Sequence, residues 1–211
     1  MSVMPALFRK QLNASLAIGV WKISESEAFF HSFLTLDSDR TEEICALHNE
    51  KRRLEKLACR AALTDLIQHF GLPLSLDNLH YAENGSPVLL KPWHVSFSHS
   101  NQYAAVAVSS ETLVGIDVEK KGDRILKLSD KILNAEEKSW CNLNNPDELY
   151  YCWCAKESIY KIVNTPRFPK DITINPIHEQ TGFVETDGGV RSFHLYQKDI
   201  DDFCLVIATN Q

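Results

Sequence analysis

Hydrophobic residues recur along the chain with two spacings, one typical of strands and the other of helices. A short run at residues 16–21 is rich in branched and aromatic side chains and predicts a strand. From about residue 41 to 70, apolar side chains recur every three or four positions, and Gly71 and Pro73 follow the last of them. This spacing predicts one amphipathic helix over 41–70 that ends at Gly71.

Shorter apolar segments separated by turn residues come next. They predict strands near residues 79–81, 88–90, 94–97, 103–108 and 113–119.

A second strong helix is expected in the last third of the chain. A polar helical region over 125–142 precedes it, Asn145 suits its N-cap, and Pro146 suits its first position. The helix should therefore run to about Val163. Strands are expected after it, near residues 172–174, 183–185, 192–195 and 203–207.

The order of strand, helix and strands occurs twice. This order predicts an α+β protein made of two similar α/β subdomains. We place the boundary between them so that residues 1–109 form an N-terminal half and residues 110–211 a C-terminal half.

Composition and charge argue against two classes of protein, general nucleic-acid binders and membrane-spanning proteins. The 211 residues include 22 Lys and Arg against 28 Asp and Glu, a net charge of −6 that argues against a general nucleic-acid binder. The apolar run near the N-terminus is far shorter than the roughly 20 residues of a membrane span. We therefore expect a cytoplasmic protein that binds neither nucleic acid nor membrane, with its six cysteines as buried free thiols.

Two carboxylates mark the strand expected over 113–119. Alternation places Asp117 and Glu119 on one face, about 7 Å apart along the strand. This pair could bind a cation. The alternative is a half-buried strand whose acidic face is solvated.

The last long helix carries an aromatic, an acidic and a basic residue in one stripe. Trp153, Glu157 and Lys161 are spaced i, i+4 and i+8, and Lys156 lies beside them. The stripe could be part of a reaction site, or it could be a surface Glu–Lys pair next to a core tryptophan.

Ser98, His99 and Ser100 form a hydroxyl-rich segment with one imidazole, expected in a turn after a strand. Such a turn offers donors to an anion, although a lone histidine in a polar loop is often only exposed.

Three cations line up on the first predicted helix. Arg53, Lys56 and Arg60 are spaced i, i+3 and i+7, which could seat a phosphate or could face solvent.

Four motifs in order then point to one family. They are Gly85-Ser86-Pro87, Ser98-His99-Ser100, the run from Gly115 through Ile116, Asp117 and Val118 to Glu119, and the run from Trp153 to Lys161 that contains Lys156 and Glu157. Together they closely resemble the 4'-phosphopantetheinyl transferase superfamily, in particular its two-half, surfactin-synthetase-activating (Sfp) type. That type is similar to two short units fused and related by a pseudo-twofold axis, with the site at their junction, and it implies a monomer.

The resemblance implies an activity and a set of catalytic residues. The enzyme would transfer the 4'-phosphopantetheine group of coenzyme A to a serine of an apo acyl or peptidyl carrier protein, giving holo-carrier and 3',5'-ADP. Asp117, Glu119 and Glu157 would hold Mg²⁺, and Glu157 would also accept the serine proton. Lys156 and Lys161 would contact the phosphates, with Lys161 nearer the departing oxygen.

The resemblance also implies residues that bind coenzyme A in the first half. They are Arg53, Arg60, Ser86, Pro87, Ser98 and His99. The family often has Lys at the position of Ser86 and Asn at the position of Ser96. Because this chain differs there, the resemblance does not determine one phosphate contact or part of the turn geometry.

The carrier and two rival functions complete the expectations. A basic cluster after the acidic strand could dock an acidic carrier, or it could be a solvated face; it comprises Lys120, Lys121, Arg124, Lys127 and Lys131. The same carboxylates could instead serve a metal-dependent hydrolase of coenzyme A or a nucleotide. A degenerate protein that binds carrier or coenzyme A without chemistry is the non-enzymatic alternative.

Overall fold

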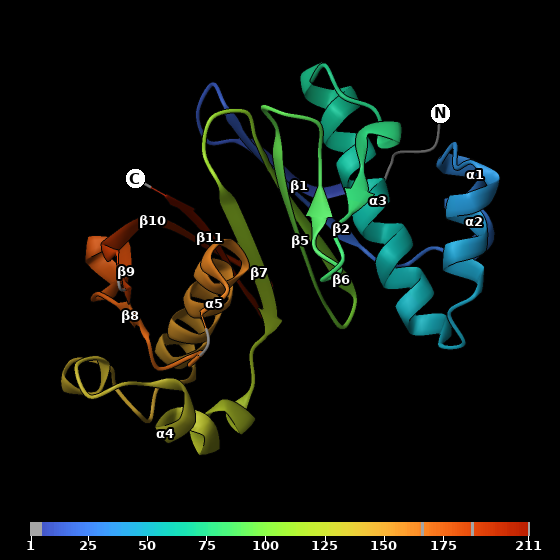
Figure 1. Ribbon diagram of the computed structural model, residues 1–211. Coiled ribbons are helices and arrows are strands. Elements are labelled where there is room, and N and C mark those ends of the chain that lie inside the picture. The colour runs from blue at the N-terminus through green and yellow to red at the C-terminus, as the bar shows by residue number, and fades with distance from the viewer. Residues whose placement is uncertain (1–5, 166, 187, 211) are drawn as a thin grey trace. The chain divides into compact units, whose positions relative to one another are not determined.

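The computed structural model describes residues 6–165, 167–186 and 188–210 (Figure 1). The chain divides into two compact units, Met1–Glu111 and Thr112–Gln211. Both contain helices and strands, which confirms the α+β class. Each unit is described by itself below.

The first unit is built on an antiparallel sheet of four strands in the order β1-β2-β6-β5. These strands are β1 (Ala6–Gln11), β2 (Leu16–Lys22), β5 (His94–Ser100) and β6 (Tyr103–Ser109). A small hairpin joins β3 (His80–Tyr81) to β4 (Pro87–Val88), and a 3₁₀ turn, η1 (Leu76–Asn78), precedes it.

Three helices accompany this sheet: α1 (Glu27–Phe33), α2 (Ser38–Cys45) and α3 (Glu50–Phe70). The long helix α3 packs along β2 and β6 (Figure 1). Its face toward the sheet carries Leu57, Ala61 and Leu66, which are fully buried. Burial of this stripe, rather than helix propensity alone, stabilises so long a helix.

The single helix expected over 41–70 is wrong in one respect, because the structure has two helices there. Asn49 accepts a hydrogen bond from the backbone N–H of Arg52 and so caps a new helix at Glu50. The apolar spacing continues through Ala46 and Leu47 and hides this break. The predicted end is confirmed, since Gly71 takes the left-handed conformation (φ 59°) that favours glycine. Strand β1 and helix α1 were not predicted.

The second unit holds a five-stranded antiparallel sheet in the order β7-β11-β10-β9-β8. The strands are β7 (Val114–Lys120), β8 (Ile172–Ile174), β9 (Thr181–Thr186), β10 (Gly189–Ile200) and β11 (Phe203–Asn210). Helix α5 (Pro146–Val163) lies against β7 and β11 (Figure 1). The Asn145 side chain accepts a hydrogen bond from the N–H of Asp147, which confirms the predicted start of this helix.

The region over 125–142 is less helical than expected. It consists of short pieces: η2 (Asp123–Leu128), α4 (Ser129–Ile132) and η3 (Glu137–Ser139). A further 3₁₀ turn, η4 (Ile177–Glu179), lies between β8 and β9.

Two further expectations concern the burial of the cysteines and membrane-spanning helices. Five of the six cysteines are buried as expected, whereas Cys45 is exposed at the end of α2. Within residues 6–165, 167–186 and 188–210, no helix is both long enough and apolar enough to cross a membrane.

Candidate functional site

Strand β7 carries its two carboxylates on the face that packs against helix α5. Asp117 pairs with Val206 and Glu119 with Cys204 across the ladder to β11, so both side chains lie on the same face. Asp117 is 6% exposed and Glu119 is half-buried. The alternative of a solvated acidic strand face is therefore wrong for Asp117.

A glycine in β7 lets α5 come this close. A Cβ atom built on Gly115 would lie 1.9 Å from the carbonyl oxygen of Ser158, closer than any side chain permits. The Ser158 hydroxyl donates to the carbonyl oxygen of Val206 in β11, at 2.9 Å. The helix therefore sits on the strands in one tight register.

Lys161 joins α5 directly to the acidic face of β7. Its Nζ donates to Asp117 Oδ1 at 2.9 Å and to the carbonyl oxygen of Ile116 at 2.6 Å. Its side chain keeps 28% of its surface exposed. An ammonium with this much exposure can still contact an anion at the site.

Glu157 is the third carboxylate of this group. Its pKa is raised to about 7, chiefly by burial and then by the charges of Asp117 and Glu119, while the Lys161 ammonium opposes the shift. The charges of Asp117 and Glu119 therefore act on Glu157 across the gap between β7 and α5. The structure brings together four residues expected at the reaction site: Asp117, Glu119, Glu157 and Lys161.

These residues fit a divalent cation by the chemistry of their donors. Carboxylate oxygens are ligands that Mg²⁺ prefers, and a divalent charge would favour the ionised form of Glu157, which burial and the neighbouring carboxylates disfavour. In the described part of the chain, no three His, Cys, Asp or Glu side chains are grouped closely enough to hold a metal. The Lys161 ammonium contacts Asp117.

Lys156 occupies a different environment from the one expected. Its side chain is 0% exposed, and its Nζ lies 2.8 Å from Glu137 Oε2. Burial lowers its pKa, and the Glu137 carboxylate opposes that shift. A buried ammonium with this partner has no access to a phosphate, so the expected phosphate contact of Lys156 does not agree with the structure.

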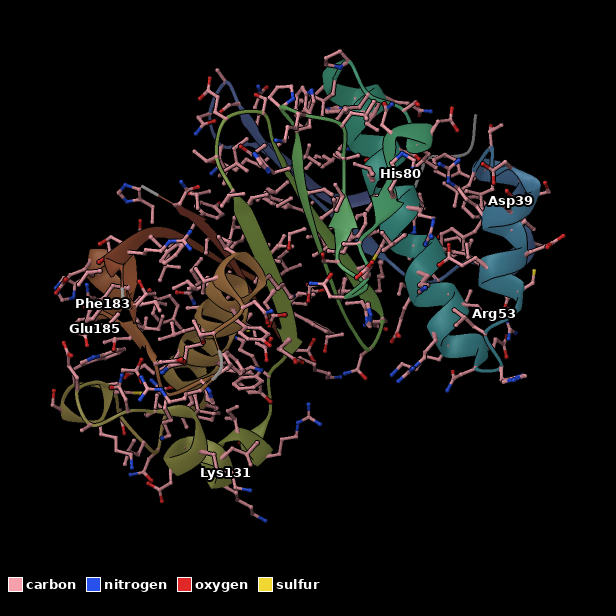
Figure 2. The ribbon with its side chains drawn as sticks, in the orientation of Figure 1. Asp39, Arg53, His80, Lys131, Phe183 and Glu185 are labelled. Atoms are coloured by element: carbon pink, nitrogen blue, oxygen red, sulfur yellow. The ribbon has the colours of Figure 1, made fainter. Side chains whose placement is uncertain are left out.

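A cavity of about 510 Å³ opens beside Glu119 and Trp153. Its other lining residues are Arg124, Ile125, Leu128, Lys131, Ile132, Tyr150, Phe168 and Pro169. Tyr150 is 2% exposed, and its hydroxyl has no hydrogen-bond partner among the described residues. Lys131, on α4 at the rim, is exposed (Figure 2).

In the first unit, Arg60 faces a second cavity, of about 310 Å³. Its guanidinium lies 5.3 Å from the centre of the Tyr81 ring and 3.5 Å from Glu43. Burial raises the pKa of Tyr81 to about 12, which keeps the phenol neutral. Arg40 lines the same cavity. Arg40 and Tyr81 were not among the expected residues, and no spacing in the sequence marks them.

Arg53 does not join Arg60 at this cavity. Its guanidinium donates to Glu27 of α1 at 2.8 Å and to the carbonyl oxygen of Leu47 at 2.6 Å. The Arg53 side chain, labelled in Figure 2, thus links the start of α3 to α1 and to the segment before α3. The three cations therefore do not form one continuous stripe toward a ligand.

The Gly-x-Pro motif forms the turn of the β3–β4 hairpin. Gly85 has φ 81°, and Pro87 stands opposite Tyr81 in the ladder. The Ser86 hydroxyl donates to Asn84 Oδ1 at 2.7 Å. The motif is thus close to the ring that stacks on Arg60.

The turn expected at Ser98, His99 and Ser100 is wrong, because these residues lie within strand β5 and pair with β6. The imidazole Nδ1 of His99 is 3.4 Å from Glu55 Oε2 on α3, and its side chain is 46% exposed. Ser98 is buried. The turn itself falls at Asn101, whose φ is 51°.

The second unit is thus an antiparallel sheet whose acidic edge strand meets a glutamate and a lysine from one helix, an arrangement suited to a cation and a phosphate ester. Residues 113–208 match the family model of the 4'-phosphopantetheinyl transferase superfamily. This match lies within the second unit and implies phosphopantetheinyl transfer in general. A comparison with curated proteins gives no match.

Proposed function

We propose that this protein transfers the 4'-phosphopantetheine group of coenzyme A to a serine of an apo acyl or peptidyl carrier protein. The products are holo-carrier and 3',5'-ADP, and the reaction depends on Mg²⁺. The observation that carries the proposal is the meeting of Asp117, Glu119, Glu157 and Lys161 inside the region matched by the superfamily.

In the proposed reaction, the serine oxygen attacks the phosphorus that bears the pantetheine arm. A new P–O bond forms to serine, and the bond to the bridging oxygen breaks, so that oxygen leaves with 3',5'-ADP and takes the electron pair. When bound to Asp117, Glu119 and Glu157, Mg²⁺ would neutralise diphosphate charge.

Glu157 and Lys161 have the remaining roles. Glu157 accepts the proton of the serine hydroxyl, directly or through one water, which requires hydrogen-bond reach. Lys161, held against β7 by Asp117 and the Ile116 carbonyl, donates to the charge that grows on the departing oxygen. Its exposed fraction leaves room for this contact.

The first unit offers groups for the nucleotide end of coenzyme A. Arg60 and Arg40 line one cavity with Tyr81, and the turn of Ser86 and Pro87 lies next to that ring. We assign the 3'-phosphate to this cavity, with Arg60 as its main cation. Ser98 and His99 stay in the proposed set, while Arg53 ranks below Arg60 because Glu27 already holds it.

We also propose that the 510 Å³ cavity and its basic rim receive the carrier protein. Arg124 and Lys131 are exposed at this cavity, whose lining is largely apolar and includes Glu119, and Lys127 is exposed on η2 between them in the sequence. An acidic helix with an apolar residue would match both features. Lys120 and Lys121 contribute less charge to this rim, because they pair with Asp202 and Asp147.

Two further expectations remain proposals. Each unit has a long helix packed on an antiparallel sheet, which supports two copies of one plan. We propose that the protein acts as a monomer in the cytoplasm.

The test is the intact mass of candidate apo-carriers incubated with coenzyme A, Mg²⁺ and this protein. We expect a gain of one phosphopantetheine and release of 3',5'-ADP only when apo-carrier is present. Release of 3',5'-ADP without carrier would instead identify a hydrolase, and binding with no product would identify a degenerate protein.

A further inference from the structure

Lys156 and Glu137 form an ion pair in the interior of the second unit. Both side chains are 0% exposed, and Lys156 Nζ lies 2.8 Å from Glu137 Oε2. Lys156 also donates to the carbonyl oxygens of Pro169 at 3.0 Å and Ile172 at 2.6 Å. An ammonium has three N–H groups, and each has an acceptor here.

Both carboxylate oxygens of Glu137 also accept hydrogen bonds from the backbone. Its Oε1 accepts from the N–H of Ile174 at 2.8 Å, and its Oε2 accepts from the N–H of Asn134 at 2.8 Å. The Asn134 side chain in turn donates to Thr173 Oγ1 at 2.8 Å. The pair therefore links α5 to both ends of β8 and to the turn before η3.

The pair acts on the helix one residue before Glu157. Lys161 fixes one side of α5 to β7, whereas Lys156 fixes another side to the β8 region. Two anchors on different sides of a helix restrict its rotation about its own axis. The contact between Gly115 and Ser158 leaves little room for α5 to shift.

We propose that Glu137 and Lys156 are positioning residues, which set the rotation of α5 and thereby place Glu157 beside the carboxylates of β7. The idea rests on the proposed function. A buried ion pair is often no more stabilising than an apolar pair of the same volume, so stability alone does not account for it. Its directional contacts define one orientation of the helix, and small displacements of a catalytic group can cost about 100-fold in rate.

The experiment removes both charges together, because removing one leaves the other buried without a partner. The test variant is Glu137→Gln with Lys156→Met. The matched control is Asp130→Asn with Lys138→Met, an ion pair whose side chains are 86% and 36% exposed. Three quantities are measured: the Tm, the kcat and KM for coenzyme A with apo-carrier, and the Kd for Mn²⁺ without coenzyme A.

A positioning role predicts that the test variant unfolds near the wild-type Tm but loses function. We expect kcat to fall and the Mn²⁺ Kd to rise, each by about 10-fold or more, with the KM for coenzyme A nearly unchanged. The control should match the wild type in all three. Wild-type kcat and Mn²⁺ affinity in the folded test variant would overturn the proposal.

The remaining outcomes are also decisive. If the first variant does not fold, Glu137→Gln with Lys156→Gln replaces it; if that fails too, the pair is a requirement of folding and the proposal is overturned. If the wild type binds Mn²⁺ but transfers nothing, the proposed function fails and the Mn²⁺ comparison alone decides on positioning. If the wild type does neither, both ideas fail.

Discussion

Lys161 Nζ lies 2.9 Å from Asp117 Oδ1, so an ammonium from α5 and a carboxylate from β7 already meet in the second unit. The contact orients Lys161 while Glu157 remains half-buried on the same helix. In the proposed reaction, this fixed ammonium meets the departing oxygen without a costly rearrangement.

Removing the proton acceptor tests the role of Glu157. We expect Glu157→Gln to lower kcat by about 100- to 10,000-fold, because the amide cannot take the serine proton. Asp117→Ala should lose activity through weaker Mg²⁺ binding. Circular dichroism and intact-mass assays check fold and transfer, and near wild-type rates in either variant would contradict the assignment.

Glycine at position 115 should be required for packing. We expect Gly115→Ala to destabilise the protein by about 1–3 kcal/mol or to prevent folding, since the new Cβ meets the Ser158 carbonyl at 1.9 Å. Urea unfolding measures the change. Gly122→Ala is the matched control, because nothing lies within 4 Å of a Cβ there. Equal stability of the two variants would show that α5 does not approach β7 so closely.

The raised pKa of Glu157 predicts a pH dependence in the metal-free protein. The pKa is about 7 against an ordinary value of 4.5, so the folded state binds more protons than the unfolded state between these values. The contribution of Glu157 to stability is therefore complete below about pH 4.5 and is lost as pH rises through about 7.

Chemical denaturation of wild type and Glu157→Gln across this range isolates that contribution. The wild type should lose stability relative to the variant as pH rises, and Mg²⁺ should remove much of the difference. A difference that stays constant with pH would show that folding does not raise the Glu157 pKa.

Features of the fold and site that depend on neighbouring residues could be predicted from the sequence, whereas features that depend on residues far apart in the chain could not. Local signals predicted α5 from Asn145 and Pro146 and the end of α3 from Gly71. The carboxylates of β7 followed from strand alternation. The burial of Lys156 could not be predicted, because its partner Glu137 comes from a separate turn and only packing brings them together.

Arg60 should distinguish coenzyme A from its dephosphorylated form. We expect Arg60→Ala to raise the Kd for coenzyme A by about 10-fold or more and the Kd for 3'-dephospho-coenzyme A much less, because the guanidinium is assigned to the 3'-phosphate. Arg53→Ala is the control and should affect the two ligands equally. Isothermal titration calorimetry measures the four dissociation constants of the two variants for the two ligands. Equal losses of affinity for both ligands in Arg60→Ala would show that the 3'-phosphate binds elsewhere.

Charge reversal at the rim of the larger cavity tests carrier docking. Arg124→Glu with Lys127→Glu should raise the KM for apo-carrier by about 10-fold, with an effect that weakens in high salt. The KM for coenzyme A should not change. Arg191→Glu, an exposed reversal on β10, is the control. Unchanged carrier kinetics in the double variant would rule out this surface.

The most direct test of the central claim is a crystal structure with coenzyme A and Mn²⁺, read from the anomalous signal of the metal. The account predicts one Mn²⁺ peak within about 2.3 Å of oxygens from Asp117, Glu119 and Glu157 and of the diphosphate. A metal bound elsewhere, or a diphosphate bound while Glu157 points away from Asp117 and Glu119, would contradict it.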